Sequence, residues 1–201
     1  TGTALEIDAT ALDQNALTAA NNESLTLTQA TADTAAITLN SGAGADIITS
    51  GAGNDTLTTG EGIDTITSSG GDDVISAGGG NDIINAGAGR DNIDAGAGND
   101  TITVATDTDF EVSGGTETVD GGAGTDTLSF TATGAAHDFS SAEMGSVKNI
   151  EVISVAANGG YSTTIGLSDT FMANNNDTIT ITAPVNTDTA DTINVNGAAV
   201  G

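Results

Sequence analysis

The sequence predicts an all-β protein in which short parallel strands and glycine-rich turns alternate along a solenoid. Aspartates recur every nine residues from Asp46 to Asp100, and an aliphatic residue follows each of them two positions later. The chain has 28 glycines but only four phenylalanines and one tyrosine, so large aromatic side chains cannot build its core. A short fixed period is the signature of a repeat architecture, in which neighbouring units bury a shared core.

The charge balance restricts the partners of this chain. It has 28 acidic and two basic residues, a formal net charge of −26. Phosphate recognition needs lysine and arginine, so nucleic-acid binding is excluded. Only Arg90 and Lys148 can neutralise carboxylates, and the remaining acids must be solvated or must hold cations. There is no cysteine for a disulfide or a thiolate metal site, and no apolar run long enough for a transmembrane segment.

The first part of the chain, residues 1–40, predicts solenoid rungs that bind no metal. Leu25, Leu27, Ile37 and Leu39 alternate with small polar residues, as in a strand with one buried face. They have no glycine–aspartate turn beside them. Residues 10–22 predict a short helix or a loop.

Residues 41–129 carry the repeat. In residues 41–103, glycines precede nearly every aspartate by two and four positions, where they let the backbone turn through positive φ. The last three residues of each unit predict a strand with its middle aliphatic directed inward. Two units complete one coil, so equivalent residues recur every 18 positions. After an interruption at 104–111, two further units follow, the first with Glu117 in the aspartate position.

The spacing of the aspartates predicts calcium between consecutive turns. Neighbouring strands lie about 4.7–4.9 Å apart, roughly twice a calcium–oxygen bond of about 2.3–2.6 Å. An ion there would be held by one aspartate from each turn and by main-chain carbonyls. Magnesium fits less well, because it demands shorter bonds and keeps several waters. The 18-residue spacing predicts at least five Ca²⁺ ions, between Asp46 and Asp64, Asp64 and Asp82, Asp82 and Asp100, Asp55 and Asp73, and Asp73 and Asp91.

These units resemble the RTX (repeats-in-toxin) family, whose nonapeptide is G-G-x-G-x-D-x-U-x. The resemblance implies a right-handed parallel β-roll with calcium-filled turns, in which aspartate carboxylates and the carbonyls of turn glycines are the ligands. Ser69 in place of a glycine and Glu117 in place of an aspartate depart from the pattern. The metal ligands implied are Gly42, Gly44, Asp46, Gly51, Gly53, Asp55, Gly60, Gly62, Asp64, Gly71, Asp73, Gly78, Gly80, Asp82, Gly87, Gly89, Asp91, Gly96, Gly98, Asp100, Gly122, Gly124 and Asp126.

The last part, residues 130–201, predicts further metal-free rungs with larger turns. Aliphatic residues recur there every 14 positions, in two sets. Residues 168–176, with Ser168 as a helix cap, and residues 140–144 predict short helical turns. The two sets are Ile153, Leu167, Ile181 and Val195, and Ile165, Ile179 and Ile193.

No catalytic constellation is present, and we expect that the protein is not an enzyme. The G-x-S-x-G, Walker A and G-x-G-x-x-G patterns are absent. His137 is the only histidine, so it cannot complete a zinc site or a triad, and we expect it at the surface. Asp107, Asp109 and Glu111 could form another ion site or a solvated loop. We expect Asp72, Asp94 and Asp120 to be solvated charges.

The RTX resemblance implies a bacterial protein exported by a type I system, which folds outside the cell where calcium is abundant. The stretches TDTLSF, KNIEVISV and GLSDTFMANNN resemble, more loosely, surface-layer and adhesin proteins. We therefore expect a secreted structural module of a surface layer, matrix fibre or adhesin. The alternative is the C-terminal RTX module of a secreted protease, lipase, epimerase or toxin.

Contacts with copies of itself or with neighbouring repeat modules are also expected. Residues 4–12 and 192–200 share a pattern of aliphatic residues, and neither end carries the polar cap that a solenoid needs. A cell-surface polysaccharide is a further candidate partner. Outward threonine pairs such as Thr65/Thr67 raise ice binding as another alternative, although the pairs are irregular along the repeat.

Overall fold

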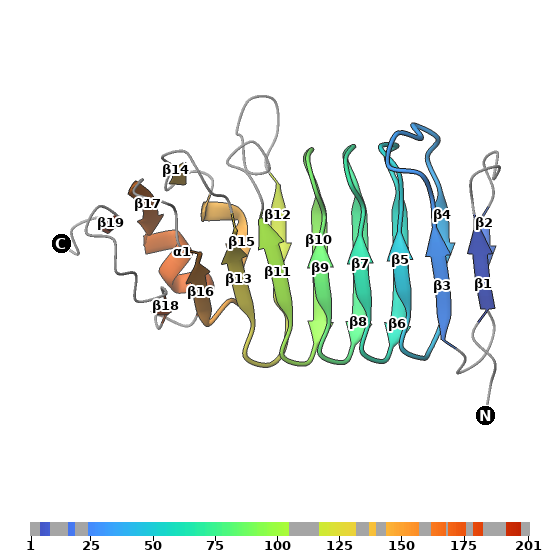
Figure 1. Ribbon diagram of the computed structural model, residues 1–201. Helices are drawn as coiled ribbons and strands as arrows, with labels where there is room; N and C mark the ends of the chain where they lie inside the picture. Colours follow the sequence, from blue (N-terminus) through green and yellow to red (C-terminus); the bar gives the residue numbers. More distant parts are fainter. Residues whose placement is uncertain are drawn as a thin grey trace.

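The computed structural model describes residues 5–8, 16–18, 24–104, 117–131, 137–139, 144–156, 162–167, 169–175, 179–182 and 192–197. These residues form short strands, one short helix and one 3-10 turn (Figure 1). The elements are β1 (Leu5–Asp8), β2 (Ala16–Thr18), β3 (Leu25–Thr28), β4 (Thr38–Asn40), β5 (Ile47–Thr49), β6 (Thr56–Glu61), β7 (Thr65–Thr67), β8 (Val74–Gly79), β9 (Ile83–Asn85), β10 (Asn92–Ala97), β11 (Thr101–Val104), β12 (Thr118–Asp120), β13 (Thr127–Phe130), β14 (His137–Phe139), the 3-10 turn (Met144–Ser146), β15 (Val147–Lys148), β16 (Val152–Val155), β17 (Ser162–Leu167), α1 (Asp169–Asn174), β18 (Thr180–Thr182) and β19 (Thr192–Gly197).

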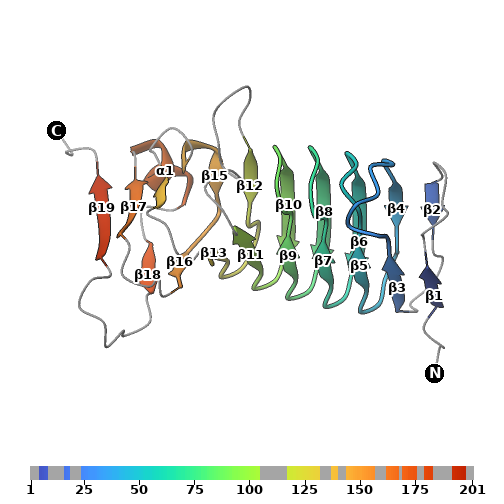
Figure 2. The same ribbon diagram turned by 45° about the horizontal axis from the view of Figure 1, so that its top comes forward.

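The strands stack side by side into parallel sheets along the length of the molecule (Figures 1 and 2). One sheet has the order β1-β3-β5-β7-β9-β11-β13-β16-β18 and a second has the order β15-β12-β10-β8-β6-β4-β2. A third sheet, β14-β17-β19, lies at the C-terminal end. Successive strands of the repeat alternate between the first two sheets, so two strands and two turns make one coil. The predicted all-β parallel β-roll is confirmed.

The register of the strands confirms the 18-residue coil. In the nine-stranded sheet Ile48 pairs with Ile66, and the same step leads on to Ile84 and Ile102. The other sheet repeats this relation between Leu57, Ile75 and Ile93. All of these aliphatic side chains are buried. Each sheet therefore contributes one inward file of branched aliphatic residues to a narrow, continuous core.

The interruption leaves the coil in register. Ile102 pairs with Leu128 and Ile93 with Val119, in each case 26 residues later instead of 18. The eight extra residues therefore do not change which side chains face the core. Residues 105–116 lie outside the described part, and so do the predicted ion ligands Asp107, Asp109 and Glu111.

A second buried file consists of small residues at the first position of each unit. In the seven-stranded sheet β6, β8 and β10 run past the predicted three residues into the next unit, as in Thr56–Glu61, and pair there as well. Their burial alternates, so the first residue of the next unit also points inward. The buried residues of this file are Ser41, Ser50, Thr59, Ser68, Ala77, Ala86 and Ala95.

The flanks differ from the sequence predictions in two places. Residues 16–18 form β2 and pair with β4, so the helix or loop predicted there was wrong for this segment, because sheet pairing outweighs the local preference. In the C-terminal part Ile153 pairs with Ile181, as two 14-residue periods require. Ile165, however, pairs with Val195 instead of Ile193, because β17 and β19 belong to a separate sheet with its own register.

Short helical segments occur near the places where the sequence predicted them. Helix α1 lies inside the predicted 168–176 segment, and its Phe171 is fully buried against the core. The 3-10 turn begins at Met144, the last residue of the predicted 140–144 segment. Ser168 lies outside the described residues, and His137 belongs to β14. No helix among the described residues has the length and apolar character needed to cross a membrane.

Candidate calcium sites

The repeat aspartates form two columns, one at each edge of the β-roll. Each aspartate stands where a glycine turn enters the next strand, and equivalent turns stack directly on one another. None of these aspartates is more than 2% exposed, although the chain is strongly acidic. The first column contains Asp46, Asp64, Asp82, Asp100 and Asp126, and the second contains Asp55, Asp73 and Asp91, followed by Glu117.

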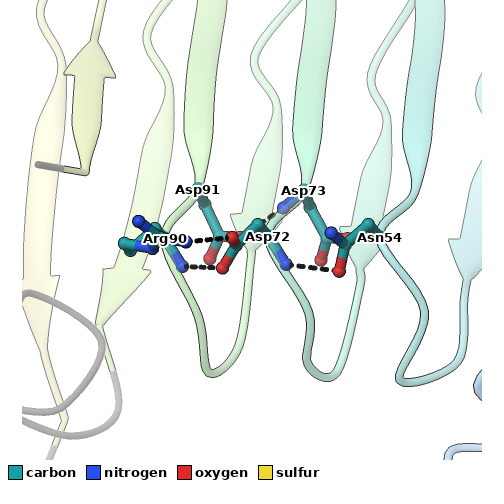
Figure 3. A network of polar contacts seen from close by, with 5 residues as sticks. All are labelled: Asn54, Asp72, Asp73, Arg90 and Asp91. Atoms are coloured by element: carbon teal, nitrogen blue, oxygen red, sulfur yellow. Dashed lines mark hydrogen bonds and ion pairs between the residues drawn. The ribbon is translucent and has the colours of Figure 1, made fainter. Parts of the chain in front are cut away.

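One oxygen of each aspartate carboxylate accepts a hydrogen bond from a backbone N–H of the previous coil. The backbone N–H of Asp46 donates to Oδ1 of Asp64 over 2.8 Å, and that of Asp64 donates in the same way to Asp82 over 2.8 Å. The second column repeats the contact, for example from the N–H of Asp73 to Asp91 (Figure 3). The carboxylates are therefore fixed in position by the backbone before any ion is considered.

The other oxygen is left without a hydrogen-bond partner. This holds for Oδ2 of seven buried aspartates: Asp46, Asp55, Asp64, Asp73, Asp82, Asp100 and Asp126. A buried anionic oxygen with no partner is costly, by several kcal/mol in a protein interior. The two cations of the chain cannot serve here, because Arg90 pairs with Asp72 and Lys148 with Asp120. The columns therefore fit an external cation.

Burial raises the pKa of six of these aspartates, Asp55, Asp64, Asp73, Asp82, Asp100 and Asp126. Desolvation raises the pKa of Asp73 to about 7, with smaller contributions from the neighbouring Asp91 and Asp55 carboxylates. It likewise raises the pKa of Asp82 and of Asp126 to about 6. Hydrogen bonds from the backbone oppose the shift but do not cancel it. Without a metal ion, protons can bind these sites close to neutral pH.

The glycines bring carbonyl oxygens to the same edges. Gly60 has a φ of 100° and Gly62 a φ of 136°, conformations that residues with a side chain resist. A β-carbon on Gly60 would collide with the carbonyl oxygen of Gly42, and one on Gly62 with that of Gly44. Each turn thus directs its carbonyls at the turn that follows. The same relation recurs at Gly78, Gly80, Gly96, Gly98, Gly122 and Gly124, and at Gly71, Gly87 and Gly89 in the other column.

Ser69, the exception in the glycine pattern, keeps this geometry, whereas the turn of Gly51 and Gly53 differs from the later turns. Ser69 adopts a φ of 66° and its carbonyl faces Gly87, as a glycine carbonyl would. Its hydroxyl also donates to the Ser50 carbonyl over 2.9 Å. Gly51 and Gly53 do not have positive φ, and each faces carbonyls of the preceding non-repeat turn, from Asp33 and Ala35.

The oxygen atoms at these edges are the ligands that a hard cation prefers. They are carboxylate and carbonyl oxygens, the ligands that Ca²⁺ takes in flexible six- to eight-fold coordination. Among the described residues no three acidic, histidine or cysteine side chains come together. Each candidate site is instead a pair of carboxylates with main-chain carbonyls, and the structure places the members of all five predicted pairs on consecutive turns.

A sixth pair was missed from the sequence. The N–H of Asp100 donates to Oδ1 of Asp126 over 2.8 Å, so these residues are neighbours in the column although 26 positions separate them. Counting only 18-residue steps could not find this pair. Glu117 lies beside Asp91 in the other column, since Thr118 donates its N–H to the Asp91 carbonyl over 2.9 Å.

Hydroxyl groups beside the columns were also missed. Ser50, Thr59 and Ser68, at the first position of their units, donate their hydroxyls to the main-chain carbonyls of Ser68, Ala77 and Ala86. Each of these hydroxyls also lowers the pKa of the aspartate five residues later. A serine or threonine five residues before Asp55, Asp64 and Asp73 was the available signal. These hydroxyls partly offset the desolvation of the carboxylates.

The remaining acids have different surroundings. Asp72 is exposed but forms an ion pair of 2.6 Å with Arg90, which lowers the pKa of Asp72 (Figure 3). Asp120, whose side chain is 23% exposed, forms a 2.6 Å ion pair with Lys148. Both acids therefore have an ion-pair partner that the sequence did not predict, in addition to their contact with solvent. Asp94 is exposed, as predicted.

The comparisons with known proteins agree with this geometry. No curated protein and no solved structure matches the chain. Residues 38–66, 67–102 and 112–129 match four copies of the RTX calcium-binding nonapeptide repeat. These ranges contain every aspartate of the two columns. Residues 38–129 are therefore made of RTX calcium-binding nonapeptide repeats.

Proposed function

We propose that this chain is a structural module of a bacterial surface layer, matrix fibre or adhesin, which folds and assembles outside the cell when calcium binds. RTX repeats indicate a calcium-binding module of secreted proteins. The observation that carries the proposal is the row of buried, unpartnered carboxylate oxygens along each edge of the β-roll. The role is one of binding and support instead of catalysis.

Calcium would supply the positive charge that the fold lacks. Consecutive aspartates stand one coil apart, so without an ion the folded state brings like charges together inside a poorly solvated edge. The core can offset little of this repulsion, since it is built mainly from one aliphatic and one small residue per unit. The free energy of metal binding is then part of the free energy of folding.

The ends of the sheets support assembly along the solenoid axis. Among the described residues, β1 and β2 stand at one end of the two large sheets, and β18 at the opposite end of the first. An end strand of a parallel sheet presents unpaired N–H and C=O groups that can pair with another strand. A second module stacked there would continue the same coil.

The outer face of the nine-stranded sheet supports lateral contacts. From β3 to β18 its outward positions carry no charged side chain, whereas the outer face of the other sheet includes Asp94 and Asp120. Copies of a chain with a net charge of −26 repel one another, and an uncharged face reduces that repulsion. The outward residues are Thr26, Thr28, Ile47, Thr49, Thr65, Thr67, Ile83, Asn85, Thr101, Thr103, Thr127, Ser129, Val152, Ser154, Thr180 and Thr182.

Removal and return of calcium tests the proposal. In excess chelator we expect circular dichroism to show a largely unfolded chain, and millimolar Ca²⁺ to restore the β signal. Sedimentation and negative-stain microscopy should then show filaments or sheets. A chain that stays folded in chelator would overturn the coupling of folding to calcium, and a strictly monomeric calcium form would overturn the assembly.

Two matched variants distinguish an effect on lateral assembly from an effect on folding. Ile83 is 50% exposed on the nine-stranded sheet and Val74 is 45% exposed on the other. We expect Ile83→Glu to reduce lateral assembly in calcium, while Val74→Glu assembles like the parent chain and both variants keep the β signal. Equal assembly of the two variants would contradict the use of this face.

A further inference from the structure

The turn after β15 takes the place of one more RTX turn, although it lies beyond the matched residues. Val152 donates its N–H to the Asp126 carbonyl over 2.9 Å, the same contact that Thr65 makes with Asp46 over 2.8 Å. The N–H of Asp126 in turn donates to Oε2 of Glu151 over 2.8 Å, as every other aspartate of this column donates to the next carboxylate. Glu151 is therefore the next acid of the first column.

Asn149 reproduces the glycine conformation of this turn. It has a φ of 54°, and apart from Ser69 it is the only non-glycine residue with positive φ in the described part of the chain. It precedes Glu151 by two positions, the separation between Gly44 and Asp46. Asparagine tolerates this conformation better than other residues with a side chain.

Two oxygens converge on the space that Gly121 leaves open. A β-carbon on Gly121 would collide with the main-chain oxygen of Asn149 and would lie 2.9 Å from Oδ2 of Asp126. That Asp126 oxygen is buried and has no hydrogen-bond partner. In residues 41–103 the equivalent first position always carries Ser, Thr or Ala, so the glycine is specific to this turn.

Residues at the end of α1, in the C-terminal part, form hydrogen bonds that fix the turn of Asn149. Asn149 donates its N–H to the Asn174 carbonyl at the end of α1 over 3.0 Å. Ile150 donates its N–H to Oδ1 of the buried Asn175 over 2.6 Å, and the Asn149 side chain donates to Asp120 over 2.7 Å. The carbonyl of Asn149 is thus positioned by contacts that do not involve the candidate ion.

We propose that Asp126, Asn149 and Glu151 form an additional calcium site that closes the first column. Oδ2 of Asp126, the main-chain oxygen of Asn149 and the Glu151 carboxylate would be its ligands, two negative charges and a carbonyl for one hard cation. The inference rests on calcium binding by the repeats. This ion would join the last RTX turn to the segment that carries α1, and so couple the calcium-dependent part of the chain to the C-terminal part.

Native mass spectrometry of the full chain in calcium counts the bound ions and tests the site. Glu151→Gln removes the charge but keeps an oxygen that can accept the Asp126 N–H, so we expect one ion fewer per chain. Asp94→Asn, which removes an exposed charge away from both columns, should leave the count unchanged, and Glu151→Asp should retain the full count. An unchanged count in Glu151→Gln, or an equal loss in Asp94→Asn, would overturn the site.

A second pair of variants tests the proposed calcium site without changing Glu151. Asn149→Gly keeps the positive φ and the carbonyl, so the full ion count is expected. Asn149→Val resists positive φ, moves the carbonyl away and should lose one ion. Retention of every ion by Asn149→Val would overturn the proposal even if Glu151→Gln failed to fold. A parent chain that binds no calcium would instead contradict the proposed function as a whole.

Discussion

At the scale of single residues, the turn glycines are required for two separate reasons. Gly78 has a φ of 105°, which disfavours any residue with a β-carbon. The carbonyl of Gly60 also occupies the space that such a β-carbon would take. Ser69 shows that a residue with a β-carbon can adopt positive φ in such a turn, because it takes a φ of 66° and its carbonyl still faces the next turn.

Alanine substitutions at two neighbouring turns should therefore differ. Gly78→Ala combines an unfavourable φ with a backbone collision, and we expect it to destabilise the calcium form by at least about 1–3 kcal/mol. Gly70 does not have positive φ, and its β-carbon would lie 3.3 Å from the Ala88 oxygen, so Gly70→Ala should cost less. Denaturant unfolding in excess calcium measures both. Equal losses of stability would contradict this explanation of the glycine columns.

At the scale of the strand, three residues are enough to form a stable strand because the strands of the neighbouring coils pair with it on both sides. In β9, Ile84 faces the core between Ile66 and Ile102, while Ile83 points away from it. The parallel pairing on both sides supplies hydrogen bonds that so short a strand cannot make alone. The strand is therefore stable only as part of the stack, as expected for a repeat architecture.

The two adjacent isoleucines of β9 provide an internal comparison. Ile84 is fully buried, and Ile84→Ala should destabilise the calcium form by about 2–5 kcal/mol, since the rigid coils cannot collapse around the cavity. Ile83 is 50% exposed, so Ile83→Ala should change stability much less. Equilibrium unfolding in excess calcium distinguishes them. A larger effect at Ile83 would mean that the inward and outward positions had been exchanged.

At the scale of the whole molecule, protons and calcium are two ways to neutralise the same columns. Burial raises the pKa of Asp73 to about 7 and of Asp82 and Asp126 to about 6, whereas an unfolded aspartate has a pKa of about 3.9. The folded metal-free chain thus binds more protons than the unfolded chain. This contribution to stability is complete below about pH 4 and is lost as the pH rises through about 6 to 7.

Acidification of the metal-free protein should therefore increase its β structure. Between pH 8 and pH 5 we expect the circular dichroism signal of protein freed of metal by dialysis to rise, and the affinity for calcium to fall over the same range. Asp73→Asn should weaken the pH response, while Asp72→Asn, at an exposed ion-paired acid, should not. A β signal that is constant or decreases towards pH 5 would contradict the role of the buried carboxylates.

The repetitive part of this fold could be predicted from the sequence because its information is local. A nine-residue spacing of Asp46, Asp55 and their successors, with an aliphatic two positions later, sets the strand, the turn and the inward side chain at once. The 18-residue step between Ile48 and Ile66 follows from two such units per coil. The columns of aspartates follow from the same step, and so does the expectation of calcium between them.

The parts that sequence reasoning missed depend on contacts between segments with unequal spacing. The neighbours Asp100 and Asp126 are separated by 26 positions, Asp126 and Glu151 by 25, and Ile165 and Val195 by 30. Segment lengths between these coils vary, so no fixed period identifies the partners. Asn149 and Gly121 acquire their roles only where the turn held by α1 meets the last repeat turn. Only packing in three dimensions settles such pairings, because a surface loop can lengthen at little cost while the buried files stay in register.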